Sequence, residues 1–418
     1  MNFQPPSKSL TPRDYQFIIL ALLVVAVASF GLVRVNLSLP RGGGDFLVHW
    51  VASRGFITER LDPYSGEVPA RVQQLVYGGA AQAGSEPYIL DTPFHLLLLY
   101  FPFALLPDPQ TARAIFNLLL ELSLLALALL SLRLTDGRTP LWFALLFVLF
   151  GVTSLYAFQA ILESNPVILL GLFYAGILWA LKSDQDEFAG ALAAFSCYYW
   201  EVGLPFLLLV LWRSYRQGRT RILASFGLWT LVLGAVSFLV YSNWFLAYLR
   251  AGMNNLRADF GFSVFTTLRQ LFPTYGQVIA WAVIVILLIA LGYEWNPSLL
   301  EDDRRFYWVA CLSLAAAPLL GFRSELENLS VLLIPLALVF SIILDRWGRL
   351  GGMLVFLLLL AVAGLPWGLY FLVLPGFLIK SGEVMYLFLP VFTLVGLYWV
   401  RWWALRPPRL WVDLVSRR

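Results

Sequence analysis

Charged residues are scarce in this chain. They make up 13% of its 418 residues, whereas soluble globular proteins carry about a quarter. Hydrophobic residues reach 60%, and the mean hydropathy is +0.76. This balance excludes an ordinary soluble protein and predicts a polytopic membrane protein. No stretch between the apolar runs has the length of a soluble domain, so we expect a single integral membrane domain over residues 1–418.

Motifs for soluble cofactors and for metals are also lacking. The sequence has no Walker loop, no glycine-rich dinucleotide fingerprint after a strand, and no His-Glu-x-x-His pattern. The two cysteines, Cys197 and Cys311, lie inside apolar runs, which argues against a disulfide framework or a zinc site. We therefore expect neither a cofactor nor a bound metal.

What the sequence does contain is a series of apolar runs of roughly spanning length. We count about twelve transmembrane helices, although several runs are shorter than the roughly 20 residues of a full crossing. The predicted segments are Phe17–Val33, Phe94–Leu106, Ala112–Leu132, Leu141–Ala157, Val167–Leu181, Phe188–Trp212, Leu223–Tyr241, Val278–Tyr293, Phe306–Leu320, Leu329–Leu344, Met353–Leu374 and Val384–Val400. The predicted fold class is thus an all-α polytopic bundle.

The distribution of basic residues predicts the orientation. The net charge is +4, but arginines crowd the loop 213–221 and the C-terminal tail, which is a topology signal and does not indicate nucleic-acid binding. Both regions are expected to be cytoplasmic, and counting crossings places the N-terminus and the segment 345–349 inside as well. The outer loops are then 34–93, 242–276 and 321–328, and we expect them to form the functional site.

Asp45 is the leading candidate residue in the first outer loop. It follows Gly42-Gly43-Gly44, read as a flexible exit from the first helix, and it precedes an apolar segment from Phe46 to about Glu59. An acid beside a membrane helix usually marks a functional site, because charge is costly there. The alternative is that Asp45 only caps this helix. Phe46, Trp50 and Ile57 share a helical stripe, which predicts an interfacial helix, and aromatic residues give the second outer loop a similar character.

Several spaced motifs carry a family resemblance. Asp45-Phe46-x-x-His49-Trp50 is followed by Asp62-Pro63-Tyr64, by Thr92-Pro93-Phe94 and by Phe101-Pro102-Phe103-Ala104-Leu105-Leu106-Pro107. This set resembles glycosyltransferase family 87, within the membrane-embedded C-type glycosyltransferase fold. The similarity is densest over residues 45–117 and continues more loosely to about residue 344.

The resemblance implies an inverting glycosyltransferase of the bacterial plasma (inner) membrane. Such a protein takes a hexose, typically mannose, from a polyprenyl-phosphate donor on the outer face and passes it to a lipid or glycan hydroxyl. Asp45 takes the role of the base that deprotonates the acceptor. The chain departs from the family pattern at three places: Glu163-Ser164-Asn165 replaces a common Gly-Gln, Trp200-Glu201 stands where Lys-Pro is common, and the third outer loop lacks a histidine.

Arginines are the candidates for binding the phosphate of the donor, because the planar guanidinium binds phosphate through two hydrogen bonds. Arg323 lies in the third outer loop beside Glu325 and Glu327, and it either binds phosphate or pairs with these acids. Arg257 and Arg269 of the second outer loop are further candidates, with solvation as the alternative.

The remaining candidates are polar residues of the first outer loop. His49 lies one turn after Asp45, so it either orients Asp45 or a phosphate, or it makes an ordinary hydrogen bond. The same alternatives hold for His95. Asp62 is expected to shape its turn by bonding its own backbone, and Tyr64 of this motif is a candidate for substrate binding.

Two further acids interrupt apolar runs. Uncompensated charge is expensive there, so Glu163 and Glu201 each suggest a partner or a water-filled cavity. The topology count puts Glu163 on the cytoplasmic side, away from Asp45, unless the flanking segments are half-helices. Two rival functions stay open: a transporter or flippase of lipid-linked glycans, and a non-catalytic lipid-binding member of the same fold.

Overall fold

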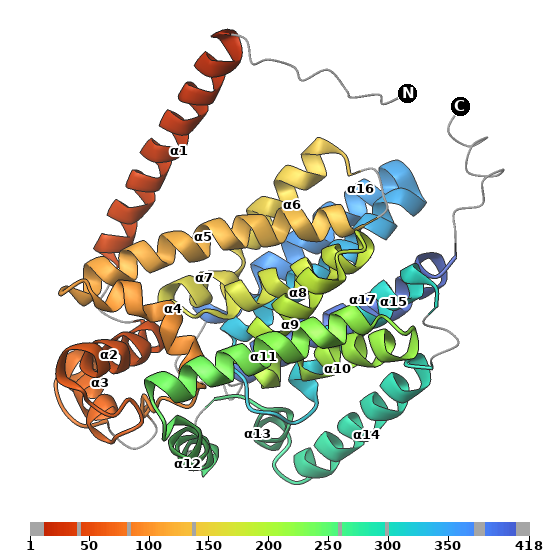
Figure 1. Ribbon diagram of the computed structural model, residues 1–418. Helices are drawn as coiled ribbons and strands as arrows, with labels where there is room; N and C mark the ends of the chain where they lie inside the picture. Colours follow the sequence, from red (N-terminus) through yellow and green to blue (C-terminus); the bar gives the residue numbers. More distant parts are fainter. Residues whose placement is uncertain are drawn as a thin grey trace.

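The chain folds into helices. The computed structural model describes residues 12–39, 43–81, 85–135, 139–257, 261–296, 301–371 and 381–406. Throughout these ranges the regular elements are helical (Figure 1), and extended pairing is limited to one isolated antiparallel bridge between Phe262 and Ser324. The prediction of an all-α fold is confirmed.

The helices follow one another with short connections. They are α1 (Pro12–Ser38), α2 (Gly44–Glu59), α3 (Glu67–Tyr77), α4 (Phe94–Ala104), α5 (Pro109–Leu134), α6 (Leu141–Thr153), α7 (Leu155–Glu163), α8 (Val167–Lys182), α9 (Asp186–Phe195), α10 (Trp200–Arg216), α11 (Thr220–Val240), α12 (Trp244–Arg257), α13 (Val264–Leu271), α14 (Gly276–Glu294), α15 (Asp303–Ala316), η2 (Ala317–Leu319), η3 (Glu327–Leu332), α16 (Leu333–Phe371) and α17 (Ser381–Ala404).

Five helices in the described part of the chain are long and apolar enough to cross a membrane. They are α5, α11, α14, the continuous run Glu327–Phe371, and residues Gly382–Ala404 of α17. A sixth crossing is added if the bent pair α6 and α7 counts as one span. The chain is therefore a multi-pass membrane protein, while the count of twelve spans stays a prediction.

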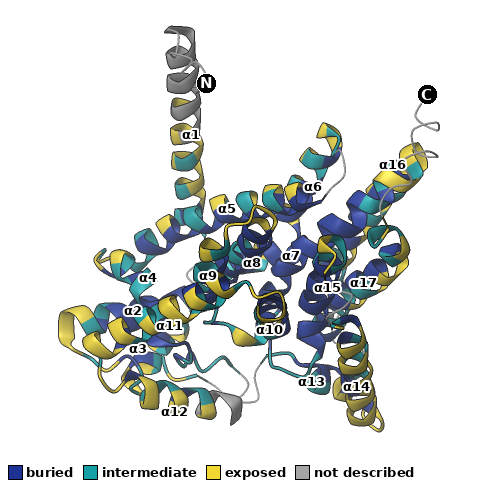
Figure 2. Ribbon diagram, turned by 45° about the vertical axis from the view of Figure 1, so that its right-hand side comes forward, coloured by how far each residue is buried: buried dark blue, intermediate teal, exposed yellow. Residues whose placement is uncertain are grey.

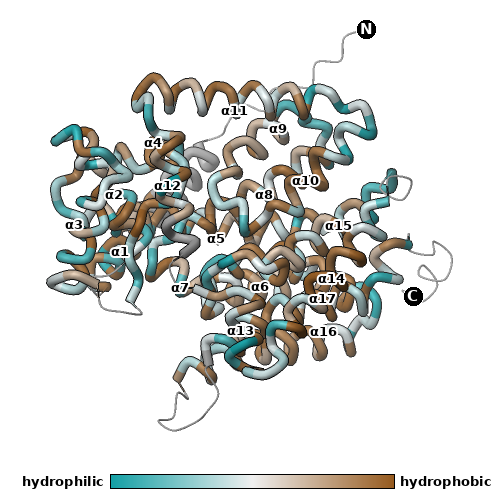
Figure 3. The backbone as a smooth tube through the Cα atoms, turned by 90° about the horizontal axis from the view of Figure 1, so that it is seen from below, coloured by the Kyte–Doolittle hydropathy of each residue, from teal (hydrophilic) through white to brown (hydrophobic). Residues whose placement is uncertain are grey.

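The outer surface of these helices is apolar. Leu239 on α11 is 86% exposed and Ile289 on α14 is 67% exposed. Figure 2 shows both helices with many exposed residues, and Figure 3 shows their hydrophobic character. Contiguous apolar surface of this kind is unfavourable in water and is matched by lipid.

Three predicted segments differ from the helices that form. Leu141–Ala157 is not one straight helix, because α6 and α7 meet at Ser154 with a bend of 47°. The Ser154 backbone is extended, and its side chain accepts the Ala157 N–H at the start of α7. Phe188–Trp212 divides into α9 and α10. The polar segment 345–349 lies inside α16, where Gly348, at a φ of 52°, breaks the helical geometry between two apolar halves.

The two expected interfacial helices behave differently. In α2, Phe46 and Trp50 are buried, but so are their neighbours on every side of the first half of the helix, so α2 is a core helix packed against α4. The prediction of an interfacial α2 is therefore wrong for this half. In α12, by contrast, the apolar side chains of Phe245, Leu246 and Met253 are exposed, as an interfacial helix requires, and Figure 2 shows exposed residues along this helix.

Candidate functional site

The site is built around the first turn of α2. The N-cap residue is Gly43, with a φ of 80°, and it makes no side-chain cap. A Cβ atom at this position would lie 2.4 Å from Nε of Arg113, so glycine is required by both conformation and space. The prediction that Asp45 caps the helix is wrong, because Asp45 lies inside the first turn. Its carboxylate is still favoured there by the helix dipole.

A turn from a distant part of the chain closes over this helix end. It comprises Glu163, Ser164 and Asn165, and we refer to it as the 163–165 turn. Glu163 Oε2 accepts the backbone N–H of Gly44 at 3.0 Å, and Asn165 Nδ2 donates to Asp45 Oδ2 at 2.5 Å. Glu163 therefore lies beside Asp45, and its predicted placement away from Asp45 is wrong.

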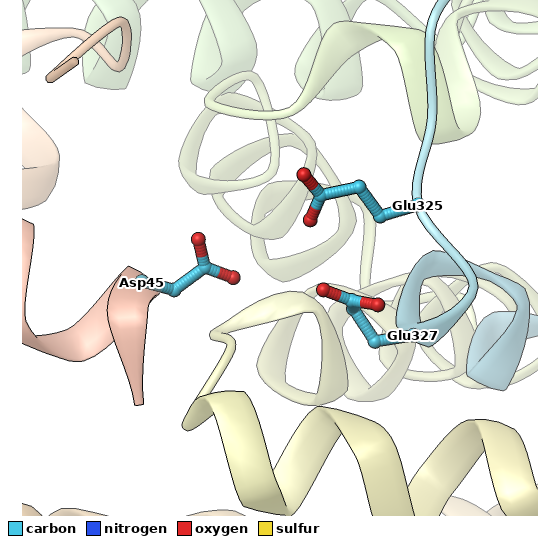
Figure 4. Close-up of side chains that lie close together, drawn as sticks. All are labelled: Asp45, Glu325 and Glu327. Atoms are coloured by element: carbon cyan, nitrogen blue, oxygen red, sulfur yellow. The ribbon is translucent and has the colours of Figure 1, made fainter. Parts of the chain in front are cut away.

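A cluster of three carboxylates defines the centre of the site. One oxygen from each of Asp45, Glu325 and Glu327 lies within 4.8 Å of the others, and Figure 4 shows the three side chains pointing toward one another. Glu325 and Glu327 lie close enough to share a hydrogen bond when one of them carries a proton. The segments predicted to be the first and third outer loops thus meet here. We call these three residues the acid cluster.

Burial and the repulsion between neighbouring carboxylates both raise pKa values in the acid cluster. Burial is the largest cause that raises the pKa of Asp45 well above its usual range, and the charges of Glu325, Glu86, Glu163 and Asp91 raise it further. Burial likewise raises the pKa of Glu325, although Arg323 opposes the shift. Neighbouring carboxylates cannot all ionise in a site of low dielectric, so the cluster holds at least one proton unless a cation is present.

Three carboxylate oxygens at this spacing suit a hard divalent cation. Mg²⁺ and Ca²⁺ prefer oxygen ligands, and Asp45, Glu325 and Glu327 could supply three of them. The same geometry also accommodates shared protons. The sequence-based expectation of a metal-free site therefore stays a prediction.

More acids surround the acid cluster. Burial, followed by the charges of Glu325 and Glu163, raises the pKa of Glu86 to about 8. Asp91 and Glu201 also lie within electrostatic reach of Glu325. Sequence reasoning did not single out Glu86 or Asp91. The apolar neighbours Tyr88 and Leu90, which are buried, are the signal that this part of the loop packs inward.

His49 does not orient the carboxylate of Asp45. Its Nδ1 bonds the backbone carbonyl of Asp45 at 2.6 Å, and its Nε2 lies 2.9 Å from Oγ1 of Thr92. The carbonyl only accepts, so Nδ1 carries the proton and Nε2 accepts from the Thr92 hydroxyl. Burial lowers the pKa of His49 to about 4, which keeps the ring neutral. Its ring stacks on Tyr100 at 4.6 Å, so His49 fixes the helix backbone.

The other candidates of the first loop have mainly structural contacts. Tyr64 donates its hydroxyl hydrogen to the carbonyl of Thr92 at 2.9 Å. Asp62 Oδ1 accepts the Tyr64 N–H at 2.9 Å, which confirms the predicted turn. His95 lies in the first turn of α4, and its Nε2 is buried without a hydrogen-bond partner among the described residues.

Of the three candidate arginines, Arg323 lies at the site. Its charge reaches Glu325 and Glu86, and its side chain crosses Gly261, where a Cβ atom would lie 2.8 Å from Nε. Arg269 is exposed in the last turn of α13. Arg257 ends α12, and its side chain falls outside the described residues.

A separate cavity of about 520 Å³ lies between α2 and α3, away from the acid cluster. Its lining includes Trp50, Leu75, Arg54 and Arg71. Both arginines are engaged: Arg54 donates to the carbonyls of residues 104 and 106, and Arg71 pairs with Glu59 and Glu67. This cavity therefore offers an apolar wall and no free cation for a phosphate.

We compared the sequence with models of protein families and with characterised proteins. No model of a protein family matches the chain, and no characterised protein matches it in sequence.

Proposed function

We propose that this protein is a membrane-embedded inverting glycosyltransferase, in which Asp45 is the base. The observation that carries this proposal is the carboxylate of Asp45, held by Asn165 within the acid cluster of the outer loops. A raised pKa makes a carboxylate a stronger base, and general base catalysis typically contributes about 10²- to 10⁴-fold in rate. The motifs of the first outer loop add the resemblance to glycosyltransferase family 87.

The proposed reaction is a single displacement. The acceptor hydroxyl oxygen attacks the anomeric carbon of the donor while its proton passes to Asp45. The bond between that carbon and the phosphate oxygen breaks, and the polyprenyl phosphate leaves with the electron pair. The configuration at the anomeric carbon is inverted. Mannose is the proposed hexose, and the acceptor is a lipid or a glycan.

Arg323 is the proposed cation for the leaving phosphate, because its charge already reaches the acid cluster. The surplus of acids around it limits how much phosphate charge the site can tolerate, so protonated carboxyl groups are part of the proposed resting state. Arg257 is a further candidate. The exposure of Arg269 weakens its own case.

The proposed setting is the plasma membrane, with about twelve spans in a C-type glycosyltransferase fold and both termini in the cytoplasm. Under this topology the loops 34–93, 242–276 and 321–328 face outward. The donor lipid enters from the bilayer. The exposed apolar face of α12 supports an interfacial position for the second of these loops.

The test is sugar transfer by purified protein in nanodiscs, with polyprenyl-phosphate mannose as the donor. We expect transfer by the wild type and a loss of at least about 10²-fold in Asp45→Asn. The control is Asp62→Asn, an acid of the same loop whose turn asparagine also supports. Wild-type turnover that persists in Asp45→Asn contradicts the assignment of the base.

A second candidate function is the transport of lipid-linked glycans. The bent helix pair α6 and α7, in which Glu163 is the last residue of α7, favours a transporter. Transporters use discontinuous helices at their binding sites. A flux assay in proteoliposomes separates the two functions. Movement of the lipid-linked sugar without covalent change supports the transporter and contradicts the transferase.

A further inference from the structure

The 163–165 turn holds Asp45 through a hydrogen bond from the side-chain amide of Asn165. Among the described residues, Asn165 is the one hydrogen-bond donor to the Asp45 carboxylate, at 2.5 Å. The amide cannot be reversed, because Asn165 Oδ1 accepts the backbone N–H of Val167 at 2.8 Å. Nδ2 is therefore the atom that faces Asp45. The Asn165 residue itself is 2% exposed, so its side of this contact is shielded from bulk water.

The backbone of the turn is braced on both sides. The Asn165 N–H donates to the carbonyl of Ala160 at 2.8 Å, and Ser164 adopts a left-handed conformation with a φ of 54°. The buried Arg113 donates through Nε to Ser164 Oγ at 3.0 Å and also to the carbonyl of Leu162. On the other side, the Tyr198 hydroxyl donates to the carbonyl of Pro166 at 3.0 Å. The turn is a rigid support and not a mobile loop.

We infer that Asn165 is the positioning residue for Asp45: its amide holds one carboxylate oxygen, so that the other is presented toward the acid cluster and the acceptor. This role rests on the proposed function of Asp45 as the base. Glu163 completes the arrangement by holding Gly44, the residue before Asp45. A neutral donor orients the carboxylate without the strong loss of basicity that a lysine or arginine at the same place would cause.

The charged groups around Asp45 determine how its hydrogen bond to Asn165 affects its protonation. The titratable groups that face it from other elements are Glu86, Asp91, Glu163, Tyr199, Glu325 and Glu327. Tyr100 of α4 also lies within electrostatic reach, and His49 of α2 bonds the Asp45 carbonyl. Arg323 and Arg113 supply the positive charges nearby. Against this mostly acidic surrounding, the amide of Asn165 favours the ionised form of Asp45.

The experiment measures the protonation of Asp45 directly. Wild type, Asn165→Ala and Asn165→Leu in nanodiscs are treated with dicyclohexylcarbodiimide, which reacts with protonated carboxyl groups. Peptide mass spectrometry then gives the fraction of labelled Asp45 as a function of pH. We expect the midpoint of labelling to move upward by about one pH unit in both variants. Asn165→Leu has nearly the shape of asparagine and removes the donor without adding a charge, so it provides the measurement even if the alanine variant fails to fold.

Ser164→Gly is the matched control, because it removes the two side-chain hydrogen bonds of Ser164 in the same turn and suits the positive φ. Its labelling midpoint should equal that of the wild type. An unmoved midpoint in both Asn165 variants overturns the positioning role. In the transfer assay, Asn165→Ala should lower kcat about 10- to 100-fold with little change in KM. If the wild type transfers no sugar but the labelling shift appears, the proposed reaction fails and the positioning of Asp45 is supported.

Discussion

Glu163 and Gly44 are joined by a hydrogen bond of 3.0 Å, although 119 positions separate them in the chain. The donor is one of the first N–H groups of α2, which have no partner within the helix. A buried N–H of this kind needs an acceptor, so Glu163 couples the end of α7 to the start of α2.

Replacing Glu163 with alanine should destabilise the protein by about 1 to 3 kcal/mol, because the Gly44 N–H loses its acceptor. Glu163→Gln retains a carbonyl oxygen and should lose less. The measurement is unfolding in detergent mixtures with increasing denaturing detergent. The exposed Glu187 offers a control, since Glu187→Ala should leave the midpoint unchanged. Equal midpoints for wild type and Glu163→Ala would show that this bond carries no stability.

Replacing Glu325 with glutamine should shift the pH dependence of transfer. Among the neighbouring charges, Glu325 contributes most to the raised pKa of Asp45, so its removal lowers that pKa. Asp45 acts as a base only when ionised, and the rate therefore rises with pH through this pKa. We expect the rising limb of the rate profile to begin at lower pH in Glu325→Gln. Glu301→Gln, outside the site, should reproduce the wild-type profile.

The protein should be more stable at pH 5 than at pH 8.5. Groups with raised pKa values in the folded state bind more protons than in the unfolded state, so stability is lost as pH rises from the unfolded pKa to the folded one. For Glu86 this interval runs from 4.5 to about 8. Each such group contributes at most about 1.4 kcal/mol per pH unit. Unfolding temperatures across this range measure the slope, which Glu86→Gln should reduce. A profile that rises with pH contradicts the argument.

Glu294 should be important for the packing of α14, α15 and α17. It is 3% exposed and pairs with Arg305 at 2.9 Å and with Arg401 at 2.7 Å. Glu294→Gln leaves two guanidinium groups beside each other without a carboxylate, which should cost about 3 to 5 kcal/mol. Thermal unfolding in detergent measures this loss. Arg349→Gln, a change at an exposed position of α16, should have no comparable effect.

The orientation can be tested by labelling single cysteines in a background without Cys197 and Cys311. A membrane-impermeant maleimide should label Ala80→Cys in intact cells, because this exposed residue belongs to the first outer loop. Gln217→Cys, in the arginine-rich loop, should react only after the cells are opened. The reverse pattern would invert the proposed topology and place the acid cluster on the cytoplasmic side.

The helical fold could be predicted because the hydropathy of each segment follows directly from its residues. The long apolar runs form α5, α11 and α14. The meeting of Asp45 with Glu325 and Glu327 also agrees with the predicted outer loops. The neighbourhood of Glu163 and Asn165 could not be derived, because these residues contact Gly44 and Asp45 from 119 and 120 positions away in the chain. The packing of one helix end against another leaves no trace in the hydropathy of either segment.

The acids Glu86 and Asp91 were also missed by the sequence analysis. Glu86 looks like an ordinary surface residue in sequence, and it is half-buried because its part of the loop packs against the start of α2, where Tyr88 meets Gly44. The prediction that Asp45 caps α2 was wrong because of a tertiary contact as well. Asp at a helix start usually bonds the helix backbone, but the close approach of Arg113 and the positive φ favour glycine at the N-cap position, Gly43, and Asp45 lies two residues further on.

The distance along the chain between Asp45 and its holder Asn165, 120 positions, sets an order of events during biosynthesis. While the ribosome is still producing α3 to α6, the carboxylate has no amide to bind and remains hydrated. The acids of the third outer loop emerge later still. A truncated chain that ends before Asn165 therefore carries Asp45 without the amide that holds its carboxylate.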